Sequence, residues 1–481
     1  SAGILYNIYK TDFSQNGAAG KMVEYRHMTV NGAVNYAYDD RYVATFSFAA
    51  DGSDNYRPGN RWGFYPSLGL GWIVSRERFL RDSRTVDLLK LRASVGKNGW
   101  DPMGEMRYLW EGYYTGRGGL NTGNSEHTWH GGTALSYLPN PGIFAEKSLK
   151  YDAGIDLRLW NRLSLNVDLF LEKRSGIVTQ DWMIPGASGV DNPPYRNIGR
   201  MTNKGFEVQL SWADRIGDFN YALTGMASYN SNKVDYMAEV VTVPTAARTG
   251  RRLDALFGYV ADGFYDWDDF DVGGELREGL PKPTFGAVQP GDIKYKNLNG
   301  DTVIDENDQT AIGDSYLPKL QYSFSLAASY KGFDLFALFQ GAAGRDVNLL
   351  DAPLQNIAFR DNGNVYGIAE GRWAYYPEQG IDTRATATYP RLSLQDNSNN
   401  YRNSTLWKRS GDFLKLRNVE LGYTFAQPSL SKAGISKIRI YLSGVNLLTV
   451  SRLMRDYDID PEILSGHPAL KSYNLGLTVT F

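Results

Sequence analysis

Several residue types and patterns that mark familiar protein classes are missing from this chain. Its 481 residues include no cysteine, which excludes disulfides, thiolate metal sites and cysteine nucleophiles and is compatible with an exported bacterial protein. The formal net charge is −2, so the composition gives no case for a nucleic-acid partner. No apolar run reaches about 18 residues, the length that a transmembrane helix needs. Residues 1–6 contain no Met and no signal peptide, so we expect a mature protein or a fragment of a longer one.

Tyrosine, glycine and alternating polarity are abundant. The 32 Tyr and 51 Gly fit a fold with many strands, many turns and rings of interfacial aromatic residues. Alternation with a period of two, which is typical of half-buried strands, recurs in about fourteen stretches. The predicted strands are 2–11, 25–38, 41–51, 62–75, 87–98, 147–159, 162–174, 203–214, 218–231, 319–330, 333–343, 410–425, 436–447 and 470–481.

The C-terminal stretch 473–481 alternates large apolar residues with Asn, Gly and Thr, and the sequence ends on an aromatic residue. An aromatic residue at the end of the last strand fits the interfacial girdle of an outer-membrane barrel. The stretch resembles the C-terminal signal that the bacterial barrel-assembly machinery reads. An ordinary strand of a soluble sandwich is the alternative interpretation. The residues of the predicted assembly signal are Tyr473, Asn474, Gly476, Val479 and Phe481.

The lengths of the links between strands favour a membrane barrel over a sandwich. Tight links at 39–40, 160–161, 215–217 and 331–332 alternate with long links at 99–146, 175–202, 232–318, 344–409 and 448–469. Short turns on one side and long loops on the other are typical of outer-membrane barrels. The sequence therefore predicts an all-β, transmembrane, antiparallel β-barrel wall with short periplasmic turns and long extracellular loops. Its polar face carries residues expected mainly to cross-link the wall, such as Arg92, Asp168, Glu172 and Arg439.

One predicted strand changes the face that carries its apolar residues. In 410–425, Leu414 and Leu416 are even-numbered, whereas Val419 and Leu421 are odd-numbered. A shift of one residue reverses every side chain, so we predict a β-bulge near Arg417-Asn418.

An ordered set of motifs resembles the SusC-like branch of TonB-dependent outer-membrane transporters. The motifs run in the family's order across nearly the whole chain, at 61–72, 89–96, 203–208, 291–301, 411–423 and 443–448. The resemblance implies a barrel of about 22 strands, closed by a plug domain that follows a TonB-interacting segment. This sequence shows neither of those parts and about eight strands fewer. We therefore expect residues 1–481 to form the C-terminal portion of the barrel, with the plug and remaining strands on another chain or outside this sequence.

The resemblance also implies a function and partners. The complete protein would import a bulky nutrient, a glycan or an oligopeptide, across the bacterial outer membrane. A SusD-like surface lipoprotein would cover the long loops, and the TonB complex would act through the plug. The wall would contact outer-membrane lipid. No organic cofactor and no enzymatic activity are expected.

The stretch 297–308 has the oxygen spacing of an EF-hand loop. Hard Ca²⁺ prefers about seven such oxygens. Asn at position one, Thr302 in place of the turn glycine and a short final carboxylate depart from the usual pattern. The alternative is a solvated acidic turn. The predicted Ca²⁺ ligands are Asn297, Asn299, Asp301, Val303 (through its carbonyl), Asp305 and Asp308.

Aromatic residues in the long links are candidates for contact with substrate, because flat rings beside polar groups suit sugar rings and peptide side chains. The alternative is that they pack loop against loop or against the lipoprotein. The candidates are Trp100, Trp110, Tyr113, Tyr114, Trp129, Trp373, Tyr375 and Tyr376.

Three other functions stay open at this point. The main alternative is a self-contained, 14-stranded passive outer-membrane channel. An outer-membrane enzyme is disfavoured, because no nucleophile or acid–base set stands at informative spacing. A soluble sandwich or propeller would show the same alternation of polarity.

Overall fold

The structure is a computed structural model. It describes residues 3–9, 19–101, 107–112, 114–122, 128–135, 137–185, 187, 192–241, 243–350, 359, 365–395, 397–425, 434–464, 467 and 469–481. The chain divides into two compact units. Unit 1 comprises 1–156, 168–204 and 232–240, and unit 2 comprises 157–167, 205–231 and 241–481.

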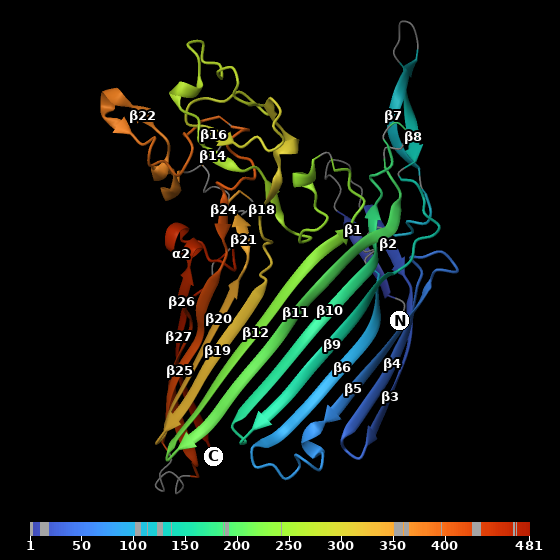
Figure 1. Ribbon diagram of the computed structural model, residues 1–481, viewed down its shortest axis with the longest axis vertical. Coiled ribbons are helices and arrows are strands. Elements are labelled where there is room, and N and C mark those ends of the chain that lie inside the picture. The colour runs from blue at the N-terminus through green and yellow to red at the C-terminus, as the bar shows by residue number, and fades with distance from the viewer. Residues whose placement is uncertain are drawn as a thin grey trace. The chain divides into compact units, whose positions relative to one another are not determined.

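Thirteen of the described strands form one sheet in which strand order follows the sequence (Figure 1). The strand pairs whose register is resolved are antiparallel. From one edge to the other the strands are β3 (His27–Tyr38), β4 (Tyr42–Ser53), β5 (Trp62–Ile73), β6 (Val86–Trp100), β9 (Glu146–Leu159), β10 (Leu163–Gln180), β11 (Tyr195–Ile216), β12 (Phe219–Tyr236), β19 (Leu320–Tyr330), β20 (Phe333–Ala343), β25 (Phe413–Phe425), β26 (Lys437–Ser451) and β27 (Ser472–Thr480).

The first predicted strand differs from expectation. Residues 2–11 were expected in the barrel wall, but β1 (Gly3–Tyr9) pairs with β2 (Ala19–Tyr25) in a separate two-stranded sheet. Gly20 and Lys21 interrupt the apolar pattern of β2, which hid this partner strand in the sequence. Thirteen of the fourteen predicted strands thus have counterparts in the large sheet as far as the structure describes it.

The predicted tight links are short hairpin turns, with two residues between the paired Tyr330 and Phe333 and three between the paired Tyr38 and Tyr42. Asp39 and Asp40 both have φ of 50°, and Trp160 and Asn161 have φ of 53° and 52°. Two successive residues in the left-handed region make the turn whose twist matches that of the flanking strands. The backbone therefore turns where the sequence predicted.

The predicted bulge is also confirmed. In the pairing of β20 with β25, Phe339 lies opposite Leu416 and Leu338 lies opposite Asn418, so Arg417 is the extra residue. The register of β25 with β26 shifts at the same place. One unpaired residue explains why the apolar positions change from even to odd numbers along β25.

Each unit exposes the apolar face of its strands. In unit 1, Phe46 lies opposite Leu68, and both side chains are exposed. In unit 2, Leu442 lies opposite Leu475, and these are also exposed. The opposite face is polar, as in the pair of hydroxyls Ser47 and Ser67, 2.6 Å apart. An exposed apolar face over whole strands is the pattern of a lipid-facing wall.

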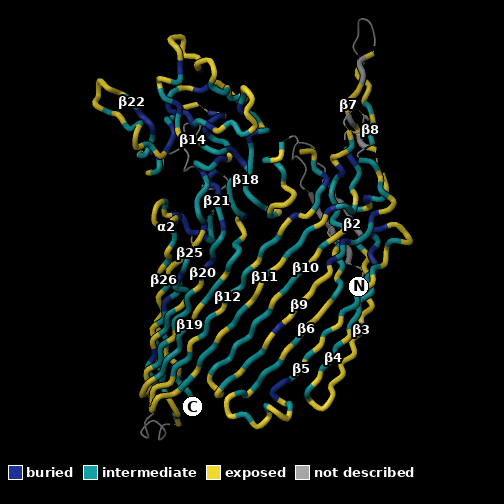
Figure 2. Tube along the Cα trace, in the orientation of Figure 1, coloured by how far each residue is buried: buried dark blue, intermediate teal, exposed yellow. Residues whose placement is uncertain are grey.

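The largest buried cluster lies mainly in the links of unit 2, not on the strands of the large sheet (Figure 2). Within the described residues, no helix has the length and apolar character needed to cross a membrane. The helical segments that the structure describes are short: η2 (Val74–Arg76), η4 (Pro244–Ala246), η5 (Trp267–Asp269), η6 (Glu306–Asp308), η8 (Gly367–Gly371), η9 (Pro377–Gln379) and α2 (Arg452–Tyr457).

Candidate functional site

Three long links of unit 2 fold together into what we call the loop domain, the described parts of residues 243–319, 344–412 and 452–471. All three links contribute to one buried core, through residues such as Ile293, Leu349, Trp407 and Leu453. Short strand pairs shape it: β13 (Leu256–Gly258) with β18 (Thr310–Gly313), β14 (Ala261–Phe264) with β16 (Ile293–Tyr295), β15 (Lys282–Pro283) with β17 (Val303–Ile304), β21 (Asp346–Asn348) with β24 (Lys408–Ser410), and β22 (Tyr375–Tyr376) with β23 (Ile381–Asp382).

A buried carboxylate, Asp292, joins two of these links. Its Oδ1 accepts hydrogen bonds from Arg391 Nε at 2.7 Å and from the amides of Asn397 and Asn400 at 2.9 Å each. Its Oδ2 accepts one from the backbone N–H of Gln289 at 2.8 Å. A charge that is fully buried is tolerated only when it is paired and hydrogen-bonded, and Asp292 has both kinds of partner. Sequence reasoning found the motif 291–301 but not this role.

The neighbouring residue, Gly291, lies against Trp373. Gly291 has φ of +90°, and a Cβ there would lie 2.5 Å from the ring of Trp373. Trp373 is 8% exposed and is therefore part of the packing of the loop domain. For this candidate, the structure favours the packing interpretation.

The other aromatic candidates have different surroundings. Trp110 is half-buried against a small core in unit 1, and Tyr375 lies under the guanidinium of Arg384, 3.9 Å from the ring centre. Tyr113 lies outside the described residues. Four candidates are well exposed: Trp100, Tyr114 on β7 (Tyr114–Thr122), Trp129 on β8 (Thr128–Leu135) and Tyr376.

A buried lysine ties the last link to the wall in unit 2. Lys415 on β25 is fully buried, and its Nζ donates to Asp460 Oδ1 at 2.7 Å and to Glu462 Oε2 at 2.8 Å. Arg417, the bulge residue, also pairs with Glu462. Burial alone would raise the pKa of both carboxyls. The bonds from Lys415 and the backbone N–H groups of Glu462 and Ile463 outweigh it for Asp460, the bonds from Arg417 and Lys415 outweigh it for Glu462, and each pKa lies below its usual value.

Charged side chains cross-link the polar face of the sheet. In unit 1, Arg92 donates to Asp156 at 3.2 Å and to Asp168 at 2.7 Å. In unit 2, Arg439 on β26 donates to Asp334 and, at 2.6 Å, to Glu420. These residues bridge neighbouring strands, as expected of most polar-face residues.

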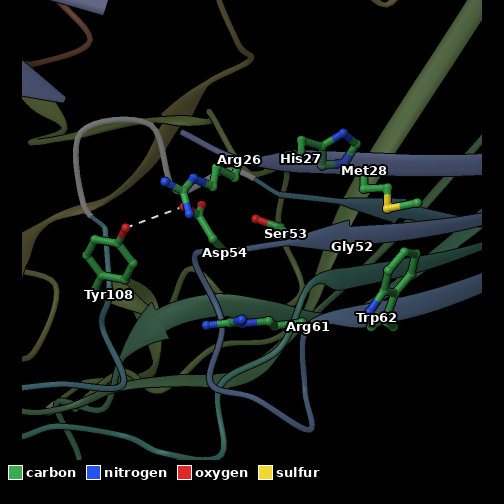
Figure 3. A pocket seen from close by; sticks show the side chains of 9 residues that line it. All are labelled: Arg26, His27, Met28, Gly52, Ser53, Asp54, Arg61, Trp62 and Tyr108. Atoms are coloured by element: carbon green, nitrogen blue, oxygen red, sulfur yellow. Dashed lines mark hydrogen bonds between the residues drawn. The ribbon is translucent and has the colours of Figure 1, made fainter. Parts of the chain in front are cut away.

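Unit 1 holds a cavity of about 460 Å³ that the sequence did not predict (Figure 3). It lies at the ends of β3, β4 and β5, with Met28, Trp62 and Arg61 among its lining residues. The hydroxyl of Tyr108 donates to Asp54 at its rim at 3.5 Å. Ser53, another lining residue, donates to Asp101 at 2.6 Å. The lining comes from four short segments between residues 26 and 108, so no local motif marks it.

The predicted calcium loop is held by its own backbone. Asp308 is fully buried and accepts from the N–H groups of Leu298 at 2.7 Å and Asp305 at 2.9 Å. Asp301 accepts from Val303 N–H at 2.8 Å. Nowhere in the described residues do three acidic, histidine or cysteine side chains come together as a metal site. The side-chain amides of Asn297 and Asn299 donate to Asp301, and their oxygens accept from the backbone N–H groups of Gly300 at 2.6 Å and Asp301 at 3.1 Å.

The chain matches the family model described as "TonB dependent receptor-like, beta-barrel" over residues 6–447. It belongs to the TonB-dependent receptor β-barrel family. Members of this family are outer-membrane proteins and are not enzymes. The apolar face of the sheet is therefore the lipid-facing side of the wall, the tight turns are periplasmic and the loop domain is extracellular.

Named relatives and solved structures agree with this assignment. TonB-dependent receptor P26 of Formosa agariphila is 29% identical over 509 residues, which cover 99% of this chain and 48% of that protein. TonB-dependent receptor SusC of Bacteroides thetaiotaomicron is 25% identical and is matched over 94% of this chain and 43% of its own length. The RagAB peptide importer in the 'open-open' state shares the fold, with a TM-score of 0.72, 21% identity and coverage of 98% of this chain and 48% of that one. The chain thus spans about half the length of the curated relatives that it matches.

The last strand of this barrel wall presents its apolar face outward. Tyr473 is exposed, and Phe481 follows directly after β27 and is 85% exposed. Gly476 lies opposite Tyr441, and a Cβ at Gly476 would overlap the Tyr441 ring. The glycine of the predicted assembly signal therefore makes room for an aromatic ring on the lumen side. Val479, its other apolar position, lies opposite Ile438.

Proposed function

We propose that the intact protein is a TonB-dependent importer of a bulky nutrient and that this chain forms part of its barrel wall and extracellular loops. The observation that carries the proposal is the loop domain: three extracellular links share one buried core on a wall of this family. Extracellular links that only closed the wall would need no shared core. A folded outer surface suits the recognition of a large substrate or of a partner protein.

A SusD-like surface lipoprotein is the proposed partner on this outer surface, and an oligopeptide or a glycan is the proposed substrate. The likeness to SusC and to the RagAB peptide importer supports the proposed lipoprotein partner and is compatible with either substrate class. The exposed candidates Trp100, Tyr114, Trp129 and Tyr376 would contact the substrate or the lipoprotein. The TonB complex would act through a plug domain supplied by the rest of the protein.

Uptake of labelled oligopeptides and oligosaccharides by cells tests this function. We expect deletion of the gene to abolish uptake of one class, and inactivation of TonB to abolish the same uptake. A protein that conducts ions steadily in planar bilayers and supports uptake without TonB would be the passive channel instead. Replacing Trp129 with alanine would then separate substrate contact, which changes uptake, from lipoprotein contact, which changes co-purification of the lipoprotein.

We also propose that the loop 297–308 binds Ca²⁺ as a stiffener of the loop domain. The oxygen spacing supports this, and a bound ion would take the amide oxygens of Asn297 and Asn299 from the backbone N–H groups of Gly300 and Asp301, alongside Asp301, Asp305 and the carbonyl of Val303. Titration of the intact protein with CaCl₂ would then slow trypsin cleavage after Lys294 and Lys296, which directly precede this loop, and Asp301→Asn would remove the effect. A rate of trypsin cleavage that does not change with calcium concentration would contradict the proposed site.

A further inference from the structure

The lipid-facing wall of unit 1 carries an apolar groove near its periplasmic end. The groove measures about 550 Å³. Small side chains at Ala44 and Ala93 form its floor, and Leu70, Tyr42 and Trp72 rise beside them. The two rings stack at 6.5 Å between centres. Such a groove has the shape and chemistry to take a hydrocarbon chain.

A polar anchor fixes the periplasmic end of this groove. Glu77, in the link that follows β5, accepts from the Tyr42 hydroxyl at 2.7 Å and from Trp72 Nε1 at 3.1 Å. Arg41 Nη1 donates to its other oxygen at 3.0 Å, so the carboxylate charge is compensated. Tyr and Trp rings with polar tips mark the membrane–water boundary. The groove therefore ends at the level of the lipid headgroups.

The link between β5 and β6, residues 74–85, is rich in arginine. Arg76 pairs with Asp40 at 2.9 Å, and Arg81 pairs with Asp82 at 3.4 Å. The acidic Asp39 of the preceding turn pairs with Arg41.

Two arginines of the link remain. Arg78 and Arg84 are exposed and form no ion pair in the part of the chain that the structure describes. Asp87, at the start of β6, is the other acidic residue nearby, and it has interactions of its own. Phe79, next to Arg78, is 73% exposed, which suits a ring that enters the membrane interface.

We propose that this groove and link form a binding site for an anionic phospholipid of the inner leaflet. One acyl chain lies in the groove over Ala44 and Ala93, beside the stacked rings of Tyr42 and Trp72, and the phosphate lies against Arg78 and Arg84. The charge complementarity selects an anionic headgroup over a zwitterionic one. The site depends on the outer-membrane location and not on what the protein transports.

Native mass spectrometry of the intact protein tests the site, after reconstitution in nanodiscs of equal phosphatidylglycerol and phosphatidylethanolamine. We expect retained lipid to be enriched in phosphatidylglycerol. The variant R78Q/R84Q would lower that enrichment by about fivefold for each arginine lost. The control R251Q, which removes an exposed arginine from the extracellular loop domain, would leave it unchanged.

A second variant probes the groove separately from the charges. A93F fills the floor, so it would reduce retention of both lipids while the preference between them persists. Equal retention of the two lipids by the wild-type protein would overturn the proposal. So would an R78Q/R84Q variant with undiminished enrichment. Loss of nutrient uptake in other assays would not bear on these results.

Discussion

Replacing Lys415 with methionine would leave two carboxylates without the cation that they share. Lys415 is buried, and the side chain of Asp460 is only 5% exposed, so solvent cannot substitute for the lost ammonium group. Glu462 would keep its pairing with Arg417, whereas Asp460 would keep only hydrogen bonds from the backbone N–H groups of Glu462 and Ile463. The perturbation therefore falls mainly on Asp460 and on the link that carries it.

The magnitude follows from the burial of the pair. Removing one partner of a buried ion pair costs about 3–5 kcal/mol, because the other charge stays buried and unpaired. Methionine approximates the volume of the lysine stem, so the loss of packing is small. We expect the cost to appear as local opening of residues 452–464, with the barrel wall intact.

Hydrogen exchange of backbone amides in 452–464 measures this opening directly. A cost of about 3 kcal/mol corresponds to exchange about a hundredfold faster in Lys415→Met. Lys437→Met, at the exposed periplasmic end of β26, is the matched control and should change nothing in that link. A double variant, Lys415→Met with Asp460→Leu, should recover much of the protection. Unchanged exchange in the single variant would refute the reasoning.

Three further predictions concern the same unit. The pKa values of Asp460 and Glu462 are lowered in the folded state. The stability that these two carboxylates contribute is therefore complete above their ordinary pKa values of about 4 and is lost as pH falls through the folded-state values. Protease protection of 452–464 should drop below about pH 4. Gly476→Leu should overlap the Tyr441 ring, cost about 1–3 kcal/mol and lower the yield of heat-modifiable barrel on gels, with partial rescue by Tyr441→Ala. Gly291→Ala should strain a left-handed residue and speed trypsin cleavage within the loop domain, without changing the yield of folded barrel.

Much of the wall could be predicted from the sequence because its determinants are local. The alternation of polarity follows the two faces of each strand, and tight turns follow dipeptides such as Asp39-Asp40. The bulge at Arg417 was predictable because one extra residue reverses the parity of every later side chain. Alternation of polarity did not predict β2, whose apolar pattern is interrupted. The pairing of β1 with β2 was therefore not expected from the sequence.

The loop domain could not be predicted in the same way. Its core joins Ile293, Leu349, Trp407 and Leu453, which come from three links and share no period. Trp373 shows the consequence: in the sequence it is an aromatic residue in a long loop, and only its packing on Gly291 makes it part of a core. Local chemistry identified candidate residues, whereas long-range packing decided which of them are exposed.

The most direct test of the account is an electron cryomicroscopy structure of the intact complex purified from the native outer membrane in detergent. In the described part of the chain, β3 and β27 each have one neighbour in the large sheet. We predict that each edge pairs with a further barrel strand from the rest of the protein, because unpaired backbone groups are not tolerated in lipid. We also predict a lipoprotein seated on the loop domain. A closed barrel in which β3 and β27 pair with each other, with bare loops, would contradict the account.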